Sequence, residues 1–391
     1  MNKDKLSLII FPGFFLPHVG GLETHVDEFT KYLSKKEEYS ITIFAPNIPN
    51  TKEEEIIHNK VKVIRYPALE LVSNFPIPKF WLPRFWKLFF SLNKEKASII
   101  MTRTRFFTNS LLGVIFSKIR LRKRIKLVHV EHGSGFVKLA SKFKTNVAYL
   151  YDKTFGKIVF KASDRIVPIS EAVNSFVKKE FTQKKLSPVI RRGVDFEIYS
   201  KVKENKQLKN KFKGKTILTF VGRLYKWKGV ENSIKAYMDL PEKIRKKTVF
   251  LIVGYGEDLD RLKELAKNCE GIYFLGKRDF KDTISILNLS DIYVHSAYAG
   301  GGLSNSLLQA MYCNCACVAS PNEGANEVVF DKKTGLLLED NSVQNLKYGI
   351  IEMIENNSLK NSCSKAGKEY IKKEYDWEKV VEAYEKVFRE I

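Results

Sequence analysis

The sequence predicts an α/β protein built from two doubly wound, Rossmann-like domains, each a parallel sheet covered by helices. With 391 residues the chain is too long for one ordinary core, and its 44% apolar content is that of a globular protein. Strand-like apolar runs alternate with helix-like amphipathic runs through both halves, which is the βαβ rhythm of a parallel sheet. We therefore expect two domains.

The first half opens with a short apolar run at residues 6–11, which predicts a buried strand. Lysines precede this run, as in a signal peptide, but glycine and proline interrupt it and no small-residue cleavage site follows. Further strands are expected at 40–44, 97–101, 125–130, 165–169 and 189–190, with a helix over 22–33.

The second half repeats this rhythm after a polar, lysine-rich stretch at residues 199–214, which predicts a linker. The first domain then covers residues 1–198 and the second 215–375, with a final helix over 376–391. Because ligands bind beyond the carboxyl ends of parallel strands, we expect the two domains to share one cleft. Strands of the second domain are expected at 216–221, 249–253, 272–275, 291–295 and 316–319.

The net charge of +23 is concentrated in one part of the chain. Residues 79–161 contain 19 Lys or Arg but only three acidic residues, Glu95, Glu131 and Asp152. Such a field attracts nucleic acid, anionic lipid or phosphorylated substrates, although a solvated lysine-rich surface explains it equally well. No nucleic-acid-binding module is recognisable, so we expect no nucleic-acid partner.

Two classes of protein are not expected from the composition. No uncharged apolar run approaches the roughly eighteen residues that a membrane-spanning helix needs. The five cysteines form no even disulfide framework and indicate a reducing compartment. Cys313, Cys315 and Cys317 alternate along a predicted buried strand, which favours small apolar packing residues, so we expect no metal site.

A glycine-rich segment at residues 300–311 carries the most information about function. It follows an apolar strand and leads into a helix-forming run, which places free backbone N–H groups and a positive helix end beside the cleft. Diphosphates bind in such places.

Fixed cations follow the first strand of the second domain. Arg223 and Lys228 come directly after this strand, next to Gly222 and Gly229. Fixed cations in a dry cleft stabilise negative charge that develops on a bound anion such as a diphosphate. Arg223 can bind phosphate through two donors, with Lys228 as a point charge. The alternative is two ordinary surface cations.

These segments resemble, in order, the motifs of retaining GT-B glycosyltransferases of family 4, and the resemblance extends over nearly the whole chain. Other matching blocks are Ile169-Ser170-Glu171, Arg192-Gly193-Val194-Asp195 and Phe274-Leu275-Gly276. The resemblance implies a GT-B fold, a nucleotide-sugar donor as substrate, and no metal or other cofactor. It assigns the donor or nucleotide to Gly20, Gly21, Gly222, Gly254, Gly276, Gly301, Gly302, Leu303, Ser304, Asn305, Gln309 and Glu327.

The resemblance also implies catalytic roles for Arg223, Lys228 and His132. His132 ends the run Val128-His129-Val130-Glu131-His132-Gly133, at the carboxyl end of a predicted strand where sites form. By alternation, His129 is expected on the same sheet face as Glu131. A single histidine is also often structural.

The glycine-rich segment departs from the family pattern at two positions. The family has two glutamates eight positions apart, which hold the sugar and the ribose, whereas this chain has Gly301 and Gln309. Gln309 can still accept one ribose hydroxyl bond. Glu323 is an extra acid that we consider as a substitute, against the alternative of a solvated loop residue. The retaining mechanism that the resemblance implies needs no protein nucleophile, unlike that of retaining glycosidases.

An aromatic and basic stretch at residues 76–90 predicts a short amphipathic helix after Pro83. Trp and Phe combined with Lys and Arg are typical of a helix that lies in the headgroup layer of a membrane. The alternative is a core helix with solvated cations. We assign the membrane or acceptor to Lys79, Trp81, Arg84, Trp86 and Lys87.

We therefore expect a retaining glycosyltransferase, peripheral to the cytoplasmic face of the cell membrane. Its expected partners are a nucleotide-sugar donor, a lipid-linked or surface-glycan acceptor, and an anionic membrane surface. The alternative is a non-catalytic homologue, a binding or partner subunit that has lost the acidic pair. In the resembled family, the C-terminal helix packs back on the first domain.

Overall fold

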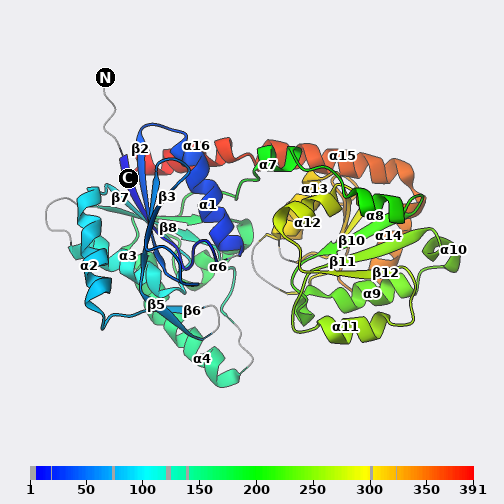
Figure 1. The fold of residues 1–391 in the computed structure, drawn as a ribbon, viewed down its shortest axis with the longest axis horizontal. Coiled ribbons are helices and arrows are strands. Elements are labelled where there is room, and N and C mark those ends of the chain that lie inside the picture. The colour runs from blue at the N-terminus through cyan, green and yellow to red at the C-terminus, as the bar shows by residue number, and fades with distance from the viewer. Residues whose placement is uncertain are drawn as a thin grey trace. The chain divides into compact units, whose positions relative to one another are not determined.

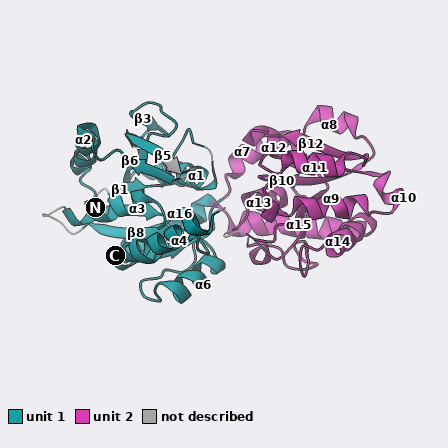
Figure 2. Cartoon of the chain, turned by 90° about the horizontal axis from the view of Figure 1, so that it is seen from below, with its two compact units in different colours: residues 1–193, 377–391 teal, residues 194–376 magenta. Residues whose placement is uncertain are grey.

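The chain folds into two compact units, which Figure 2 shows in different colours. The computed structural model describes residues 6–18, 20–72, 75–119, 125–137, 141–299, 303–322 and 324–391. Unit 1 consists of residues 1–193 and 377–391, and unit 2 of residues 194–376. Unit 1 is therefore built from two separate pieces of the chain.

Unit 1 contains a seven-stranded sheet with the order β3-β4-β2-β1-β7-β8-β9. All neighbours in it are parallel except β3 and β4. The chain moves outward from β1 on one side and then restarts on the other side at β7. The strands are β1 (Leu6–Phe11), β2 (Tyr39–Pro46), β3 (Glu54–Ile57), β4 (Val61–Tyr66), β7 (Ile99–Arg103), β8 (Lys126–Glu131) and β9 (Arg165–Pro168), beside a hairpin of β5 (Ala68–Val72) and β6 (Phe75–Pro78).

Helices cover both faces of this sheet, as expected for a doubly wound fold (Figure 1). The buried faces of the sheet pack into two separate apolar clusters, one containing α1 and α16 and the other α2 and α3. The helices are α1 (Gly21–Ser34), α2 (Pro83–Ser91), α3 (Thr108–Ile119), α4 (Lys142–Tyr151), α5 (Lys157–Ala162), α6 (Glu171–Glu180) and α16 (Trp377–Arg389), with a π-helical turn at Asp152–Gly156 and a 3-10 turn at Leu92–Glu95.

One tryptophan locks α16 onto the rest of unit 1. Trp377 is fully buried, and its indole N–H donates to the Glu28 carboxylate at 3.1 Å. Arg192 also donates to Glu28, at 2.8 Å, so that carboxylate joins α1 to both places where the chain crosses between the units. The ring packs against Gly193, where a Cβ atom would lie only 2.3 Å from it. Glycine at 193 is therefore required by packing.

Unit 2 contains a six-stranded parallel sheet with the order β12-β11-β10-β13-β14-β15. The chain again winds outward from a central strand, β10, and then restarts beside it at β13. The strands are β10 (Thr216–Val221), β11 (Thr248–Val253), β12 (Ile272–Gly276), β13 (Ile292–His295), β14 (Ala316–Ala319) and β15 (Leu336–Leu337).

Helices again cover both faces of the sheet in unit 2 (Figure 1). Cys313, Cys315 and Cys317 are buried in the apolar cluster beneath α13, and burial raises the pKa of the Cys313 thiol to about 12. The helices are α7 (Phe196–Ser200), α8 (Lys206–Lys211), α9 (Val230–Met238), α10 (Glu242–Arg245), α11 (Leu259–Ala266), α12 (Phe280–Leu287), α13 (Asn305–Tyr312), α14 (Val343–Glu355) and α15 (Asn357–Glu374), with 3-10 turns at Lys226–Lys228 and Ala325–Glu327.

The predicted α/β class with parallel sheets is confirmed, but some elements differ from the prediction. No strand forms at 189–190, where Ile190 makes a single backbone bond to Pro168 instead. The stretch at 199–214, expected as a linker, belongs to unit 2 and carries part of α7 and all of α8. The strands β3 to β6 and β15 are absent from the prediction. β3, β5, β6 and β15 are short and give little periodic signal, and Lys62 and Arg65 interrupt the apolar pattern of the interior strand β4.

In the part of the chain that the structure describes, no helix is both long enough and apolar enough to span a bilayer.

Substituting Gly193 is expected to destabilise unit 1, because Trp377 is fully buried and has little room to move. Overpacking of this kind costs about 1–3 kcal/mol, so Gly193→Ala should lower the midpoint of urea unfolding. Gly135→Ala is the matched control, since among the described residues nothing lies within 4 Å of its added Cβ. Equal midpoints for the two variants would contradict this packing argument.

Candidate functional site

The sheet of unit 2 changes winding direction between β10 and β13, and open α/β sheets bind ligands at such a switch point. Gly222 and Arg223 directly follow β10 and so lie at its carboxyl end. The Tyr293 hydroxyl on β13 donates to the Val221 carbonyl at 3.2 Å and bonds to the Ser306 hydroxyl at 2.8 Å. This tyrosine joins the end of β10 to the start of α13.

Three predicted glycines lie side by side along this edge. The Gly222 N–H donates to the Val253 carbonyl at 3.0 Å, and the Gly254 N–H donates to the Gly276 carbonyl at 2.9 Å. A Cβ atom on Gly254, whose φ is +149°, would lie 1.8 Å from the Gly222 carbonyl oxygen. No side chain fits there, so the backbone itself forms the floor at this edge.

Arg223 and Lys228 occupy the loop above this edge, and both side chains are partly buried. The Arg223 guanidinium donates to the Tyr225 hydroxyl at 3.2 Å, and among the described residues no carboxylate pairs with it. The Lys228 ammonium lies 4.4 Å from the centre of the Trp227 ring. Arg223 therefore carries a partly buried positive charge at this edge, with no carboxylate counter-ion among the residues that the structure describes.

A histidine that the sequence analysis did not select lies near Lys228. His295 ends β13 and is buried, and burial followed by the charge of Lys228 lowers its pKa to about 4. The loop that carries Lys228 is joined to the segment after β13, since the Ser296 hydroxyl donates to the Lys228 carbonyl at 3.0 Å. The position of His295 at a strand end, as for His132, would have been the signal.

The helix α13 begins at this same edge. Ser304 is its N-cap, and the Ser304 and Ser306 hydroxyls lie 3.2 Å apart. Asn305 is the first helical residue, and Leu303 precedes the cap and packs against Gly324. Gln309 is half-buried on the second turn, and no hydrogen bond of its side chain to another described residue is observed. The predicted donor residues Gly301 and Gly302 lie outside the described residues.

The loop after β14 adds Glu327, which ends a short 3-10 turn and is half-buried. Its carbonyl accepts from the Tyr370 hydroxyl at 3.2 Å. Glu323, considered as a substitute acid, lies outside the described residues.

In unit 1 the predicted glycines begin α1, with Gly20 as its N-cap and Gly21 as its first residue. Gly20 has an extended backbone with φ of −167°, which any residue can adopt, so its backbone conformation does not require glycine. A Cβ at that position would instead meet the Glu23 carboxylate, which bonds to His18 at 2.7 Å.

His132 follows β8 and lies against a second histidine. The rings of His25 and His132 meet edge to face at 5.1 Å, and Arg103 donates to Nδ1 of His25. Burial, followed by the charge of Arg103, lowers the pKa of His132 to about 3 and that of His25 well below its usual value. Both imidazoles are therefore neutral at neutral pH, next to a buried arginine.

His129, unlike His132, is fully buried, and its ring makes hydrogen bonds inside the core. Its ring nitrogens lie 2.8 Å from the Thr102 hydroxyl and 3.1 Å from Glu131. Burial opposes ionisation of Glu131, but Arg105 at 2.9 Å and the bond to His129 hold its pKa at about 2. This carboxylate also accepts from the backbone N–H groups of His132 and Gly133, and so fixes the turn that carries His132.

The aromatic and basic stretch forms α2 and the turn before it. Trp81 and Trp86 are 65% and 40% exposed, whereas Phe89 is buried against the sheet. Lys87 is exposed and Lys79 is partly buried. Arg84 forms a two-pronged ion pair with Glu53, which reduces its availability to a lipid phosphate. The segment therefore has features of both a core helix and a membrane-interface helix. The helix α2 buries an apolar face against the sheet, while Trp86 on α2 and Trp81 before it are exposed.

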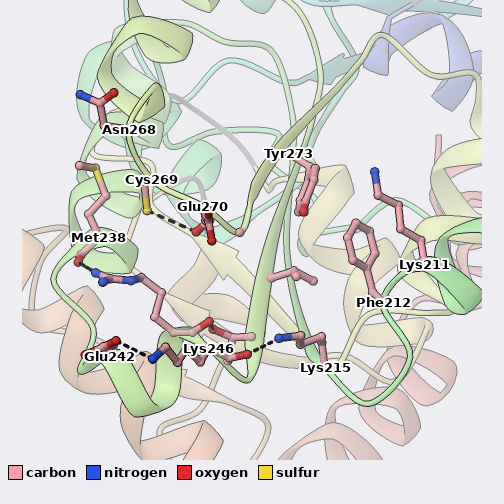
Figure 3. A pocket seen from close by; sticks show the side chains of 14 residues that line it. Lys211, Phe212, Lys215, Met238, Glu242, Lys246, Asn268, Cys269, Glu270 and Tyr273 are labelled. Carbon is pink, nitrogen blue, oxygen red and sulfur yellow. Dashed lines mark hydrogen bonds and ion pairs between the residues drawn. The ribbon is translucent and has the colours of Figure 1, made fainter.

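The structure has a large cavity of about 640 Å³ at the other end of the unit 2 sheet, near the amino ends of β10 to β12 (Figure 3). Its cations already have partners. Lys246 pairs with Glu242 at 2.7 Å, Lys215 donates to the Lys246 carbonyl, and Arg245 donates to the Met238 carbonyl at 2.8 Å. We assign no ligand to this cavity. Among the described residues, no cluster of three or more His, Cys, Asp or Glu suited to a metal ion is found.

Comparison with known proteins places both units in one family. The model of glycosyl transferases group 1 matches residues 201–370, and that of glycosyltransferase family 4 matches residues 19–198. An uncharacterised glycosyltransferase of Methanocaldococcus jannaschii is 56% identical over 99% of both chains. A GDP-mannose-dependent monoacylated α-(1-6)-phosphatidylinositol monomannoside mannosyltransferase of Corynebacterium glutamicum is 24% identical over 97% of this chain and 96% of its own.

Solved structures share the fold at low identity. Sucrose-phosphate synthase of Thermosynechococcus elongatus superposes with a TM-score of 0.80 at 17% identity, covering 99% of this chain and 98% of its own. Anabaena HepE, solved in complex with UDP-glucose, gives a TM-score of 0.73 at 18% identity, covering 98% of this chain and 99% of its own. With its parallel sheets and these relatives, the chain belongs to the GT-B glycosyltransferases of group 1.

Proposed function

We propose that this glycosyltransferase transfers a sugar, with retention of anomeric configuration, from a nucleotide-sugar donor to a lipid-linked or surface-glycan acceptor at the cytoplasmic face of the membrane. The observation that carries the donor assignment is Arg223, a partly buried cation without a carboxylate partner among the described residues, at the switch point of the unit 2 sheet. HepE, solved with UDP-glucose, supports the donor class, and the mannosyltransferase of Corynebacterium supports a lipid acceptor.

The proposed reaction uses the positive charge of Arg223 and Lys228. The bond between the anomeric carbon and the diphosphate oxygen breaks, and the acceptor oxygen bonds to that carbon on the same face. The acceptor proton moves to the departing phosphate oxygen, so no protein nucleophile is needed. Cations held in place before the reaction stabilise the leaving diphosphate without reorganising.

We propose that His132 contacts the acceptor. Because its pKa is lowered to about 3, the ring is neutral at neutral pH and offers hydrogen bonds to a sugar hydroxyl without adding charge. The fixed turn at Glu131 orients this ring.

A second candidate function is a non-catalytic homologue, which the replacement of the family glutamates by Gly301 and Gln309 favours. A carboxylate that accepts two hydroxyl bonds is hard to replace, because charge-assisted bonds are each worth about 1.5–3 kcal/mol. The two candidates differ in whether the protein binds any nucleotide sugar.

Removing either cation is expected to weaken nucleotide diphosphate binding by about ten- to a hundredfold, the loss of one charge-assisted bond. Calorimetric titration of Arg223→Ala and Lys228→Ala with UDP and GDP measures this. The matched control is Lys226→Ala, an exposed lysine of the same turn. Near-normal binding by both variants would sink the diphosphate assignment.

Restoring the second glutamate is expected to strengthen ribose binding. In a thermal-shift screen of UDP- and GDP-sugars, we expect one donor to raise the melting temperature of the wild type. Gln309→Glu should enlarge that rise, because a charge-assisted hydrogen bond stabilises the complex by about 1 kcal/mol more than a neutral one. Gly301→Glu tests the sugar contact in the same way, and Gln207→Glu, on an exposed position of α8, controls for the added charge. No shift with any donor in the wild type, but a shift in a variant that carries both Gly301→Glu and Gln309→Glu, would favour the non-catalytic homologue.

The exposed aromatic side chains of α2 and of the turn before it are expected to contribute to membrane binding. Trp81→Ser, Trp86→Ser and Phe90→Ser together should reduce flotation with vesicles containing phosphatidylglycerol, since these side chains are 40–65% exposed and their removal should leave the core intact. Ile56→Ser, which removes a similarly exposed apolar side chain from β3, is the control. Unchanged flotation of a folded triple variant would reject α2 as an anchor.

A further inference from the structure

The helix α4 exposes an apolar stripe that nothing in unit 1 covers among the described residues. Phe143, Val147 and Leu150 are 76%, 53% and 64% exposed. At 100° per residue they fall within about 60° of one another on the helix. The exposed Lys142 and Lys144 lie about 100° to either side of Phe143, which is the arrangement of a helix that lies in a membrane interface. Figure 1 shows α4 projecting beyond the rest of unit 1.

The base of α4 is firmly held, although its stripe is exposed. The helix continues through the π-helical turn into α5, and Asp152 in that turn pairs with the buried Arg105 at 2.9 Å. The Tyr151 ring packs against Phe75 and Phe106 at 5.8 and 5.6 Å. The stripe is therefore carried on a rigid support.

A cavity of about 230 Å³ lies where α5 meets the segment after α6. Four lysines line it and no carboxylate does, namely Lys157, Lys161, Lys184 and Lys185. The rings of Phe160 and Phe181, 4.8 Å apart, form its apolar part. Lys185 is held in place by bonds to the carbonyls of Ser163 and Lys161, at 2.6 and 3.2 Å. Such a pocket fits an anion attached to an apolar group.

The acidic residues near this surface are already paired. Glu180, at the end of α6, pairs with Lys153 at 2.9 Å. Between residues 79 and 161, Glu131 and Asp152 both pair with Arg105 in the interior, and Glu95 pairs with Lys62. A second copy of this chain would bring the same positive charges to a two-fold interface, which disfavours self-association through this face. Nucleic acid would leave the apolar stripe in water. An anionic bilayer satisfies both the stripe and the lysines.

We propose that α4 and the four-lysine pocket form a membrane-docking surface, in which the α4 stripe enters the bilayer interface and the pocket binds the phosphate of an anionic lipid headgroup. This inference rests on the membrane part of the proposed function and adds a surface separate from α2. It does not depend on the donor or on catalysis.

Flotation with vesicles of 30% phosphatidylglycerol and 70% phosphatidylcholine tests the surface. One variant carries Phe143→Ser, Val147→Ser and Leu150→Ser, and another carries Lys157→Gln, Lys161→Gln and Lys184→Gln. Each is expected to weaken partitioning by about tenfold or more, because each lysine near an anionic surface contributes about fivefold. Binding of the wild type should also fall with added salt.

A charge-matched variant separates this surface from general charge, and the Trp81→Ser, Trp86→Ser and Phe90→Ser variant described above separates it from α2. Lys203→Gln, Lys206→Gln and Lys213→Gln remove the same charge from exposed positions in unit 2 and should change partitioning little. Circular dichroism checks that each variant is folded, and size-exclusion chromatography with light scattering checks its oligomeric state.

Equal flotation of the wild type and both test variants would overturn the inference. So would equal losses in the test and control lysine variants, or a change from dimer to monomer in the stripe variant. Loss of flotation in the α2 variant alone would overturn it too, but leave the proposed membrane function intact. If the wild type does not float, the membrane function fails as well, whereas nucleotide binding by calorimetry still tests the donor assignment.

Discussion

The candidate donor site depends on how closely the backbone packs at the carboxyl ends of β10 and β11. Gly254 approaches the Gly222 carbonyl so closely that a methyl group would overlap it. A second close approach lies at Gly229, with φ of +67°, where a Cβ would lie 2.0 Å from the Ser296 carbonyl oxygen. These contacts keep the loop bearing Arg223 and Lys228 flat against the ends of β10 and β13. A side chain at Gly229 or Gly254 would push this loop, with Arg223 and Lys228, away from the carboxyl ends of the strands.

Arg105 in unit 1 and Arg223 in unit 2 differ in how their charge is compensated. In unit 1, Arg105 is shared by Glu131 and Asp152, so the cation is neutralised inside the protein. In unit 2, Arg223 has no such partner among the described residues, and Lys228 lies close enough to His295 to help keep that ring neutral. The charge of Arg105 is compensated and supports the structure, while the charge of Arg223 remains available to an anionic ligand.

Much of the fold could be predicted from sequence, because the central strands are long apolar runs between turns. The edge strands β9 and β12 were predicted, but the edge strands β3 and β15, the interior strand β4 and the hairpin β5–β6 were missed. Lys62 and Arg65 interrupt the apolar pattern of β4, and the other missed strands are too short to give a clear one. Candidate site residues that follow strands, such as Arg223 and His132, could be selected because the apolar runs that predict the strands also show where the strands end. His295 also ends a strand and could have been selected in the same way, whereas His25 and Arg103 could not, because their importance arises from contacts between elements. The apolar stripe on α4 has the sequence pattern of any amphipathic helix. Only the structure shows that the described residues leave this stripe exposed.

The division of unit 1 into two pieces of chain has a consequence for its biosynthesis. All of unit 2 is translated between Gly193 and Trp377, so the first 193 residues leave the ribosome with the surface for α16 still uncovered. Phe29 and Tyr32 of α1, which pack on the Trp377 ring, remain exposed during that time. Unit 2, being continuous, can complete its core first. The nascent first unit therefore keeps this apolar surface uncovered until α16 has been synthesised.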